Sequence, residues 1–109
     1  VVVWGSGNPR REFLHVDDLA RAIIVCLEKY DSDEHINIGT GSDLTIKDLA
    51  EKIAKISGFK GEIIWDSTKE DGTLRKLLDI HKITKLGWKP EVSLEQGIKT
   101  TIDWYLKNK

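Results

Sequence analysis

The sequence contains very little sulfur and has no strong charge of either sign. Its single cysteine, Cys26, has no partner for an internal disulfide and lies in an apolar helical pattern, so we expect an inert, buried thiol. One Cys and three scattered His give no spacing typical of a metal site. The formal net charge of -1 provides no overall basic field, so we expect no nucleic-acid partner and no membrane-surface partner.

Long apolar runs and a recognisable leader are also missing. The apolar runs are only a few residues long, which is too short to cross a bilayer. A composition of 39% hydrophobic and 32% charged residues is ordinary for a globular protein, and we expect a cytoplasmic location. The length suits one domain, residues 1–109. Because the chain opens on an apolar strand at Val1, we expect it to be a segment of a longer protein.

The first eighteen residues organise the rest of the chain. An apolar run at 1–4 predicts a strand, and the Gly, Asn and Pro of 5–9 predict a turn. Two arginines follow, then a second extended run at 13–16, then a helix for which Asp17 or Asp18 is the expected N-cap. An aromatic ring and two guanidinium groups therefore lie at the two ends of one turn, which suits an anionic ligand that carries a ring.

Beyond residue 18 the pattern alternates between helices and short strands. Apolar spacing predicts a helix to about residue 30 whose buried stripe includes Leu19, Ile23 and Leu27. Strands are expected at 35–39 and 62–66. Further helices are expected after Thr45 and Ser93, which both begin capping boxes, and over 80–86 after Asp79. The last helix should bury a stripe that includes Thr101 and Tyr105. This is a mixed α/β arrangement with too few alternating units for a complete doubly wound sheet.

Three residues are the strongest candidates for ligand binding. The Arg11 guanidinium can grip phosphate oxygens with two hydrogen bonds, but it could also be solvated or paired with Glu12 or Asp17. Trp4 could stack on a base or pack into the core. The two acceptor oxygens of Asp71 suit sugar hydroxyls or a guanine edge, although Asp-Gly is also an ordinary turn dipeptide.

Other candidates carry less weight. We expect Arg10 to be a solvated residue, and Arg75 and Lys76 either lend positive charge to a ligand or are solvated. His15 alternates with apolar neighbours and has no second catalytic group beside it in the sequence, which favours a structural role. Gly39-Thr40-Gly41 lacks the third glycine of a dinucleotide loop, so it reads as a simple strand-to-helix connection.

Three segments resemble the GDP-L-fucose synthases, which are extended short-chain dehydrogenases/reductases that act on nucleotide sugars. They are WGSGNPRREFLHVDD at 4–18, INIGTG at 36–41 and DGTLRKLLD at 71–79. The pattern R-x-F-x-x-V-D-D is shared by the wider nucleotide-sugar epimerase superfamily, and the segment at 71–79 narrows the resemblance to the fucose synthases. The resemblance covers nearly the whole chain but only about the C-terminal third of the family's protein.

The resemblance implies the C-terminal, substrate-binding part of an extended short-chain dehydrogenase, with an incomplete Rossmann sheet. NADP would be bound by a missing N-terminal domain, and the intact enzyme, typically a homodimer, would convert GDP-4-keto-6-deoxy-D-mannose to GDP-L-fucose. Trp4, Arg11 and Asp71 fall on positions that contact the GDP-sugar. The family's Tyr-x-x-x-Lys pair and its epimerisation residues have no counterpart here, so we expect no catalytic residue, no cofactor-binding residue and no activity in this chain alone.

Two other interpretations remain open from the sequence. The chain could derive from an NAD-dependent epimerase or dehydratase that acts on a UDP- or dTDP-sugar, although the segment at 71–79 argues against this. It could also be a stand-alone α/β binding module with no enzymatic parent. Under the resemblance to the fucose synthases, the strand expected at 36–39 belongs to the sheet of the missing cofactor domain. It would lack neighbours in this chain, so we expect an exposed edge or self-association there.

Overall fold

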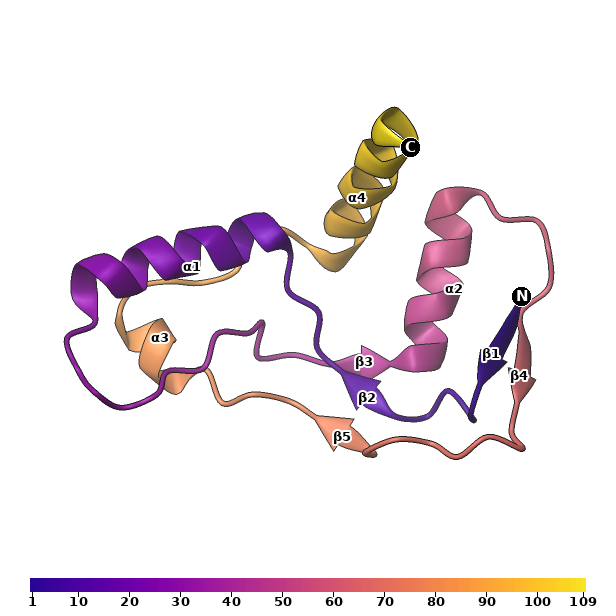
Figure 1. Cartoon of the computed structure of the whole chain (residues 1–109), viewed down its shortest axis with the longest axis horizontal. Helices are drawn as coiled ribbons and strands as arrows, with labels where there is room; N and C mark the ends of the chain where they lie inside the picture. The colour runs from indigo at the N-terminus through magenta and orange to yellow at the C-terminus, as the bar shows by residue number, and fades with distance from the viewer.

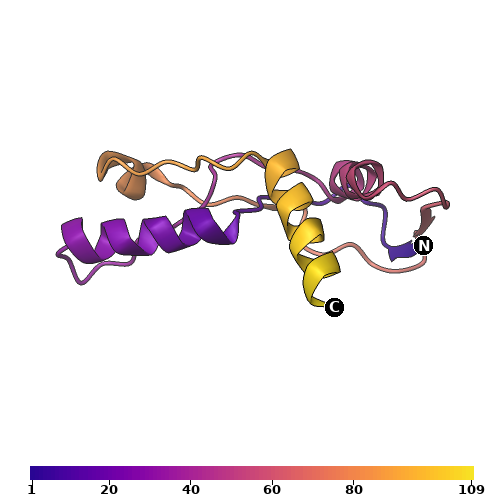
Figure 2. The same ribbon diagram turned by 90° about the horizontal axis from the view of Figure 1, so that it is seen from above.

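The chain folds into an elongated arrangement of small sheets and helices. The computed structural model describes all residues, 1–109, and measures 48 × 34 × 19 Å. Its radius of gyration is 16.5 Å, against about 13 Å for a compact domain of roughly 100 residues. Helices α1 (Val16–Lys29) and α3 (His81–Lys85) lie at one end, two small sheets lie at the other, and α4 (Leu94–Asn108) projects between them (Figures 1 and 2). The chain therefore spreads its contacts over a wide area instead of enclosing one core.

Two separate sheets form the strand layer. Strand β1 (Val2–Trp4) pairs in parallel with β4 (Ile64–Asp66). In the second sheet, β2 (Arg10–Arg11) lies between β3 (Leu44–Thr45), which is antiparallel to it, and β5 (Arg75–Lys76), which is parallel. Both sheets join the first eleven residues to segments more than thirty positions away, and in this way they bring the segment between β4 and β5 beside the opening turn.

The two best-capped helices begin where the sequence predicts. Helix α2 (Ile46–Ser57) starts after Thr45, whose side chain accepts a hydrogen bond from the Asp48 amide. It ends at Gly58, which has a φ of 71°, a conformation that favours glycine. Helix α4 (Leu94–Asn108) starts after Ser93, whose hydroxyl accepts from the Gln96 amide. Strong local capping signals thus fix both starting points.

The N-cap predicted for the first helix is wrong. Helix α1 (Val16–Lys29) is capped by His15, whose Nδ1 accepts from the Asp17 amide at 3.2 Å. Asp17 lies in the first turn, and Asp18 is buried there with no exposed surface. A buried partner elsewhere in the chain determines the position of Asp18, which capping rules do not take into account.

Two predicted strands are also absent. Residues 13–15 are irregular before α1, and residues 35–39 run without a strand partner. An alternating pattern becomes a strand only where a neighbouring chain pairs with it, and here neither segment has one. Helix α3 (His81–Lys85) is shorter than the predicted 80–86, and its N-cap is Ile80, not Asp79 as predicted. Asp79 lies one position earlier and accepts a hydrogen bond from the His81 amide at 2.8 Å.

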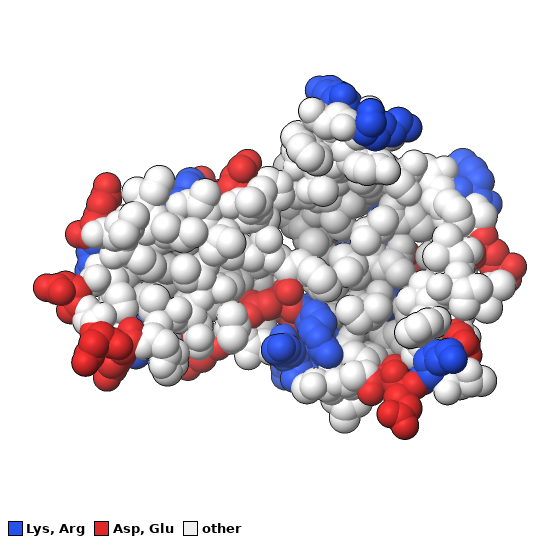
Figure 3. Space-filling model, in the orientation of Figure 1, with Lys and Arg blue, Asp and Glu red and all other residues white.

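The core is small, and much apolar surface is left open. Only 9 of 109 residues are buried, and Ala22, Ile83 and Trp88 form the central cluster between α1 and α3. Cys26 packs against this cluster but is only half-buried, in contrast to the prediction. Figure 3 shows broad uncharged surface over α1 and between α4 and α2, with charges mainly around the rim.

The helical stripes predicted to be buried are therefore only partly covered, since Ala22 of α1 is buried but other members are exposed. On α1, Leu19, Ile23 and Leu27 face solvent, with Leu27 82% exposed. On α4, the predicted stripe holds at Ile98 and Ile102, which are half-buried, but fails at Thr101 and Tyr105. No helix of the chain combines the length and apolar character needed to cross a membrane. Amphipathic spacing identifies a face that needs cover, but cannot say whether this chain supplies it.

Candidate functional site

The three predicted binding residues line one small cavity. It has a volume of about 150 Å³ and lies where the end of β1, the following turn, β2 and the loop before β5 meet. Its walls are Trp4, Gly7, Pro9, Arg11, Ile46, Glu70, Asp71 and Gly72. The structure therefore brings Trp4, Arg11 and Asp71 together. Their binding role stays a prediction.

The backbone of the turn at 5–7 is shaped so that the turn can lie close to the loop at 69–72. Gly5 and Gly7 have φ values of 86° and 80°, which residues other than glycine rarely adopt. A Cβ atom on Gly5 would collide with the Asp71 carboxylate, and one on Gly7 would lie 2.9 Å from the Trp65 ring. The Gly5 amide donates to the Asp66 carbonyl at 2.9 Å, which extends the β1–β4 pairing into the turn. The two glycines thus let the turn approach the loop at 69–72.

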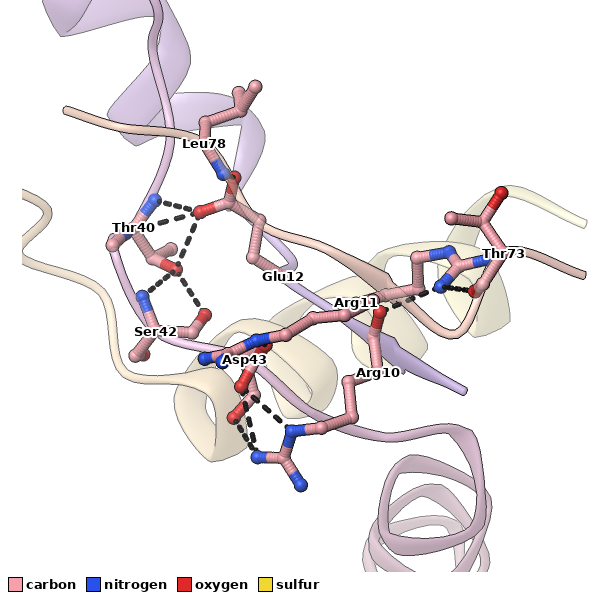
Figure 4. Close-up of polar contacts among 10 residues, drawn as sticks. Arg10, Arg11, Glu12, Thr40, Ser42, Asp43, Thr73 and Leu78 are labelled. Atoms are coloured by element: carbon pink, nitrogen blue, oxygen red, sulfur yellow. Dashed lines mark hydrogen bonds and ion pairs between the residues drawn. The ribbon is translucent and has the colours of Figure 1, made fainter. Parts of the chain in front are cut away.

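Arg11 takes part in none of the chain's ion pairs. Its Nη1 donates to the Arg10 carbonyl at 2.7 Å and to the Thr73 carbonyl at 2.6 Å, and Figure 4 shows the side chain extending toward Thr73. Neutral carbonyls orient the guanidinium without neutralising it. The alternatives of pairing with Glu12 or Asp17 do not occur, because Glu12 binds backbone amides and Asp17 lies beside His15. Arg11 is therefore held at the cavity as a positive charge.

The Asp71 carboxylate, which also lines the cavity, is held by two hydrogen bonds from one residue, Ser6. The Ser6 amide donates to Oδ1 at 2.8 Å, and the Ser6 hydroxyl donates to Oδ2 at 2.5 Å. These two hydrogen bonds, the hydroxyl's first, lower the pKa of the Asp71 carboxyl below its ordinary value. The cavity thus carries a firmly ionised acceptor beside a free cation.

The prediction that Arg10 is solvated holds only in part, because its side chain is 42% exposed but is paired with Asp43. Its Nε donates to Asp43 Oδ1 at 3.0 Å, and its Nη2 donates to the Asp43 carbonyl. Arg75 binds the other carboxylate oxygen of Asp43 at 2.6 Å. The Arg75 hydrogen bond, followed by that of Arg10, lowers the pKa of the Asp43 carboxyl. Asp43 therefore ties β2 to β5, and Figure 4 shows Arg10 directed toward it while Arg11 points elsewhere.

Glu12 organises the neighbouring loops, a role the sequence did not reveal. Its Oε2 accepts from the amides of Thr40 at 3.0 Å and Gly41 at 3.1 Å, and its Oε1 accepts from the Leu78 amide at 2.9 Å (Figure 4). A Cβ atom on Gly39 would lie 2.6 Å from this carboxylate. The Gly-x-Gly loop thus turns its amides onto an internal carboxylate. Only the adjacency of Glu12 to the two arginines could have drawn attention to it.

Trp4 and His15 occupy contrasting surroundings. The Trp4 residue is 73% exposed, so it does not pack in the core, and the Lys69 ammonium lies 5.5 Å from its ring centroid. His15 caps α1 and approaches the Thr100 hydroxyl of α4 at 3.3 Å, which agrees with the predicted structural role. One ring is thus available at the cavity, whereas the other is part of the framework.

Two larger hollows lie away from this cavity. One, of about 610 Å³, is mainly apolar and is lined by Leu49 and Ile53 of α2 and by Ile98 and Ile102 of α4, among others. Another, of about 450 Å³, lies between Asp43 and the segment at 90–94. The apolar hollow lacks convergent polar groups, which ligand sites normally have, so size alone does not mark it as the site. The 450 Å³ hollow also has charged walls, but Asp43, Lys52 and Glu91 are already in ion pairs. The small cavity is the better candidate because it holds Arg11, which is in none, together with Trp4 and Asp71.

A family model and a solved structure show which class of proteins the chain resembles. Residues 1–39 match the NAD dependent epimerase/dehydratase family. The chain resembles the structure of a GDP-L-fucose synthetase from Naegleria fowleri bound to NADP, with a TM-score of 0.92 and 32% sequence identity. The match includes 98% of this chain and 34% of that structure's chain. The expected fold class, a mixed α/β arrangement with part of a Rossmann-type sheet, is confirmed by this match.

The sequence relatives are more specific. Over 99% of its length the chain is 56% identical to GDP-L-fucose synthase 1 of Arabidopsis thaliana and 50% identical to the GDP-L-fucose synthase of Escherichia coli (strain K12). The resemblance to the GDP-L-fucose synthases is therefore confirmed. The chain spans only about a third of these relatives, 33% and 36% of their lengths.

Proposed function

We propose that this chain is the C-terminal, substrate-binding segment of an NADP-dependent epimerase/reductase that forms GDP-L-fucose from GDP-4-keto-6-deoxy-D-mannose. The whole protein would act in the cytoplasm, typically as a homodimer. Identities of 50–56% to proteins named GDP-L-fucose synthase support the substrate class. The cavity that unites Trp4, Arg11 and Asp71 is the observation that carries the proposal.

The cavity suits part of a nucleotide sugar. Arg11 offers a fixed cation for a diphosphate, Trp4 offers an exposed ring for a base or sugar face, and Asp71 offers an acceptor for hydroxyl or N–H donors. A volume of about 150 Å³ falls below the roughly 300–1,000 Å³ of ligand pockets. The remaining walls would come from the rest of the protein, which in the relatives is two-thirds of the length.

The chain by itself fits the cofactor poorly. A dinucleotide needs free backbone amides in a glycine-rich loop, but the amides of Thr40 and Gly41 are bonded to Glu12. NADPH would therefore be held by another domain and, when bound there, would supply the hydride. Tyr105 and Lys109 have Tyr-x-x-x-Lys spacing, but Tyr105 is exposed on α4 and does not line the cavity. Accordingly, we propose that the chain alone has no turnover.

A calorimetric titration of the full-length protein with GDP tests the proposal. We expect binding that weakens at high salt, because a charged diphosphate contact is screened. Arg11→Ala should reduce affinity about 10- to 100-fold, the equivalent of roughly 1.5–3 kcal/mol for hydrogen bonds to a charged group. Lys60→Ala is a charge-matched control in an exposed loop and should leave affinity unchanged. Equal affinity in the Arg11 and Lys60 variants would refute the assignment.

A further inference from the structure

One contact beside the cavity has no part in the function proposed so far. Ser6 uses both its amide and its hydroxyl on Asp71, one for each carboxylate oxygen. The same hydroxyl accepts from the Asn8 amide at 3.1 Å, which fixes its rotation. A chain of hydrogen bonds therefore runs from the turn backbone through Ser6 to the carboxylate.

The surrounding backbone is shaped around this contact. Gly5 has a positive φ and leaves the space that Asp71 Oδ1 fills. On the other side, the Arg11 Nη2 atom lies 3.5 Å from the Cβ position of Gly72. The Asp71 side chain is thus held in place by the turn at 5–7, while the next residue, Gly72, lies beside Arg11. Ser6 itself does not line the cavity.

We propose that Ser6 is a positioning residue, which sets the rotation of the Asp71 carboxylate so that its free lone pairs accept hydrogen bonds from hydroxyl or ring N–H groups of the ligand. This inference rests on the proposed function of the cavity. The carboxylate repels phosphate, so Asp71 takes the uncharged part of a nucleotide sugar, and Arg11 takes the diphosphate. Ser6 thereby orients the acceptor for the uncharged part of the ligand.

Ionisation of Asp71 follows from the same contact. Hydrogen bonds from Ser6 favour the charged carboxyl and lower its pKa. Loss of the Ser6 hydroxyl should therefore move the pKa of Asp71 upward. Ligand binding that depends on the carboxylate would then be lost at a higher pH than in the unaltered protein.

The test uses the full-length protein and two probes, GDP and GDP-L-fucose, in calorimetric titrations across pH. Ser6→Ala should weaken GDP-L-fucose binding about tenfold, the factor for one hydrogen bond to a charged group, and should shift the acid limb of the affinity profile upward. Ser6→Thr, which keeps the hydroxyl, should restore both affinity and limb. Weakening with both probes would place the donors on the nucleoside, and weakening with GDP-L-fucose alone would place them on the hexose.

Asp71→Asn provides the second variant. It should remove the acid limb, and adding Ser6→Ala to it should produce little further loss, because Ser6 acts through Asp71. Full additivity of the two substitutions, or an unshifted limb in Ser6→Ala, would overturn the role of Ser6. If Arg11→Ala weakens binding while the Ser6 variants do not, only this inference fails. If the unaltered protein binds neither probe, the proposed function fails and this inference fails with it.

Discussion

The Asp18 carboxylate, with no exposed surface, accepts a hydrogen bond from the Val92 amide, 74 positions later in the chain, at 3.0 Å. The Glu91 amide and the Arg21 guanidinium bind the same carboxylate. This cluster fastens the start of α1 to the segment that leads into α4 through Ser93. It is one of the polar connections between the opening motif and the C-terminal part of the chain, beside the contact of His15 with Thr100 of α4.

Removing this carboxylate should destabilise the protein. In Asp18→Ala two backbone amides lose their acceptor and Arg21 loses its partner, which should lower the free energy of unfolding by about 2–3 kcal/mol after allowing for the partial exposure of Arg21. Denaturant unfolding of the full-length protein measures this loss. Asp17→Ala, in the adjacent exposed position, is the control and should change stability by less than about 1 kcal/mol. Equal effects would contradict the structural role of Asp18.

The loss of stability at low pH should depend on the same residue, Asp18. Burial by itself would raise the pKa of Asp18, but hydrogen bonds from Val92, Arg21 and Glu91 outweigh burial and lower it below the ordinary value of 3.8. The stabilisation is therefore complete above the ordinary pKa and is lost as pH falls through the lower, folded pKa. Unfolding measured from pH 6 down to about pH 2 should show stability falling in the lowest part of that range. Asp18→Ala should flatten this fall, and an unchanged slope would rule out Asp18 as its source.

Asp43 should matter more than either of its partners. Arg10 and Arg75 bind opposite oxygens of one carboxylate, so each single arginine variant leaves one ion pair, whereas Asp43→Asn weakens both. We expect the melting temperature to fall further in Asp43→Asn than in Arg10→Gln or Arg75→Gln. Affinity for GDP should fall as well, because β2 carries Arg11 and β5 follows the loop of Asp71. Identical melting temperatures in the three variants would show that the carboxylate does not connect the strands.

Competition among nucleotides separates the proposed substrate class from its closest alternative. If the cavity serves a GDP-sugar, GDP should displace a bound fluorescent GDP analogue from the full-length protein at a lower concentration than UDP or dTDP. All three share the diphosphate that Arg11 contacts, so the difference reports on the base and ribose. Preference for UDP or dTDP would instead favour an epimerase or dehydratase that acts on those sugars.

The open apolar face of α1 should make the isolated chain associate with itself. Val16, Ile23, Ile24 and Leu27 lie on one side of the helix and are 48–82% exposed. Sedimentation of the 109-residue chain should show oligomers, and the double variant Ile24→Glu/Leu27→Glu should reduce them. Glu28→Gln, an exposed change on the same helix, is the control. A monomeric unaltered chain would show that this face needs no cover.

Local signals in the sequence predicted the parts of the fold that depend on neighbours in the chain. Thr45 and Ser93 began helices as expected, and Gly58 ended one, because caps satisfy backbone groups within a few residues. The strands predicted at 13–16 and 35–39 are absent, because a strand does not depend on sequence neighbours alone. A strand needs a partner, and an alternating pattern cannot say whether one is present.

The chemistry of the candidate site can be read from the amino-acid sequence, because Trp4 supplies a ring, Arg11 a fixed charge and Asp71 two acceptor oxygens. The arrangement of these groups depends on contacts between distant parts of the chain. Parallel pairing of β1 with β4 and of β2 with β5 brings the loop of Asp71 to the opening turn. The tertiary structure also decided that Asp43 would bind Arg10, that Glu12 would bind three amides, and that Asp18 would be buried. These partners lie between 28 and 74 positions apart, and no local pattern records a contact over such distances.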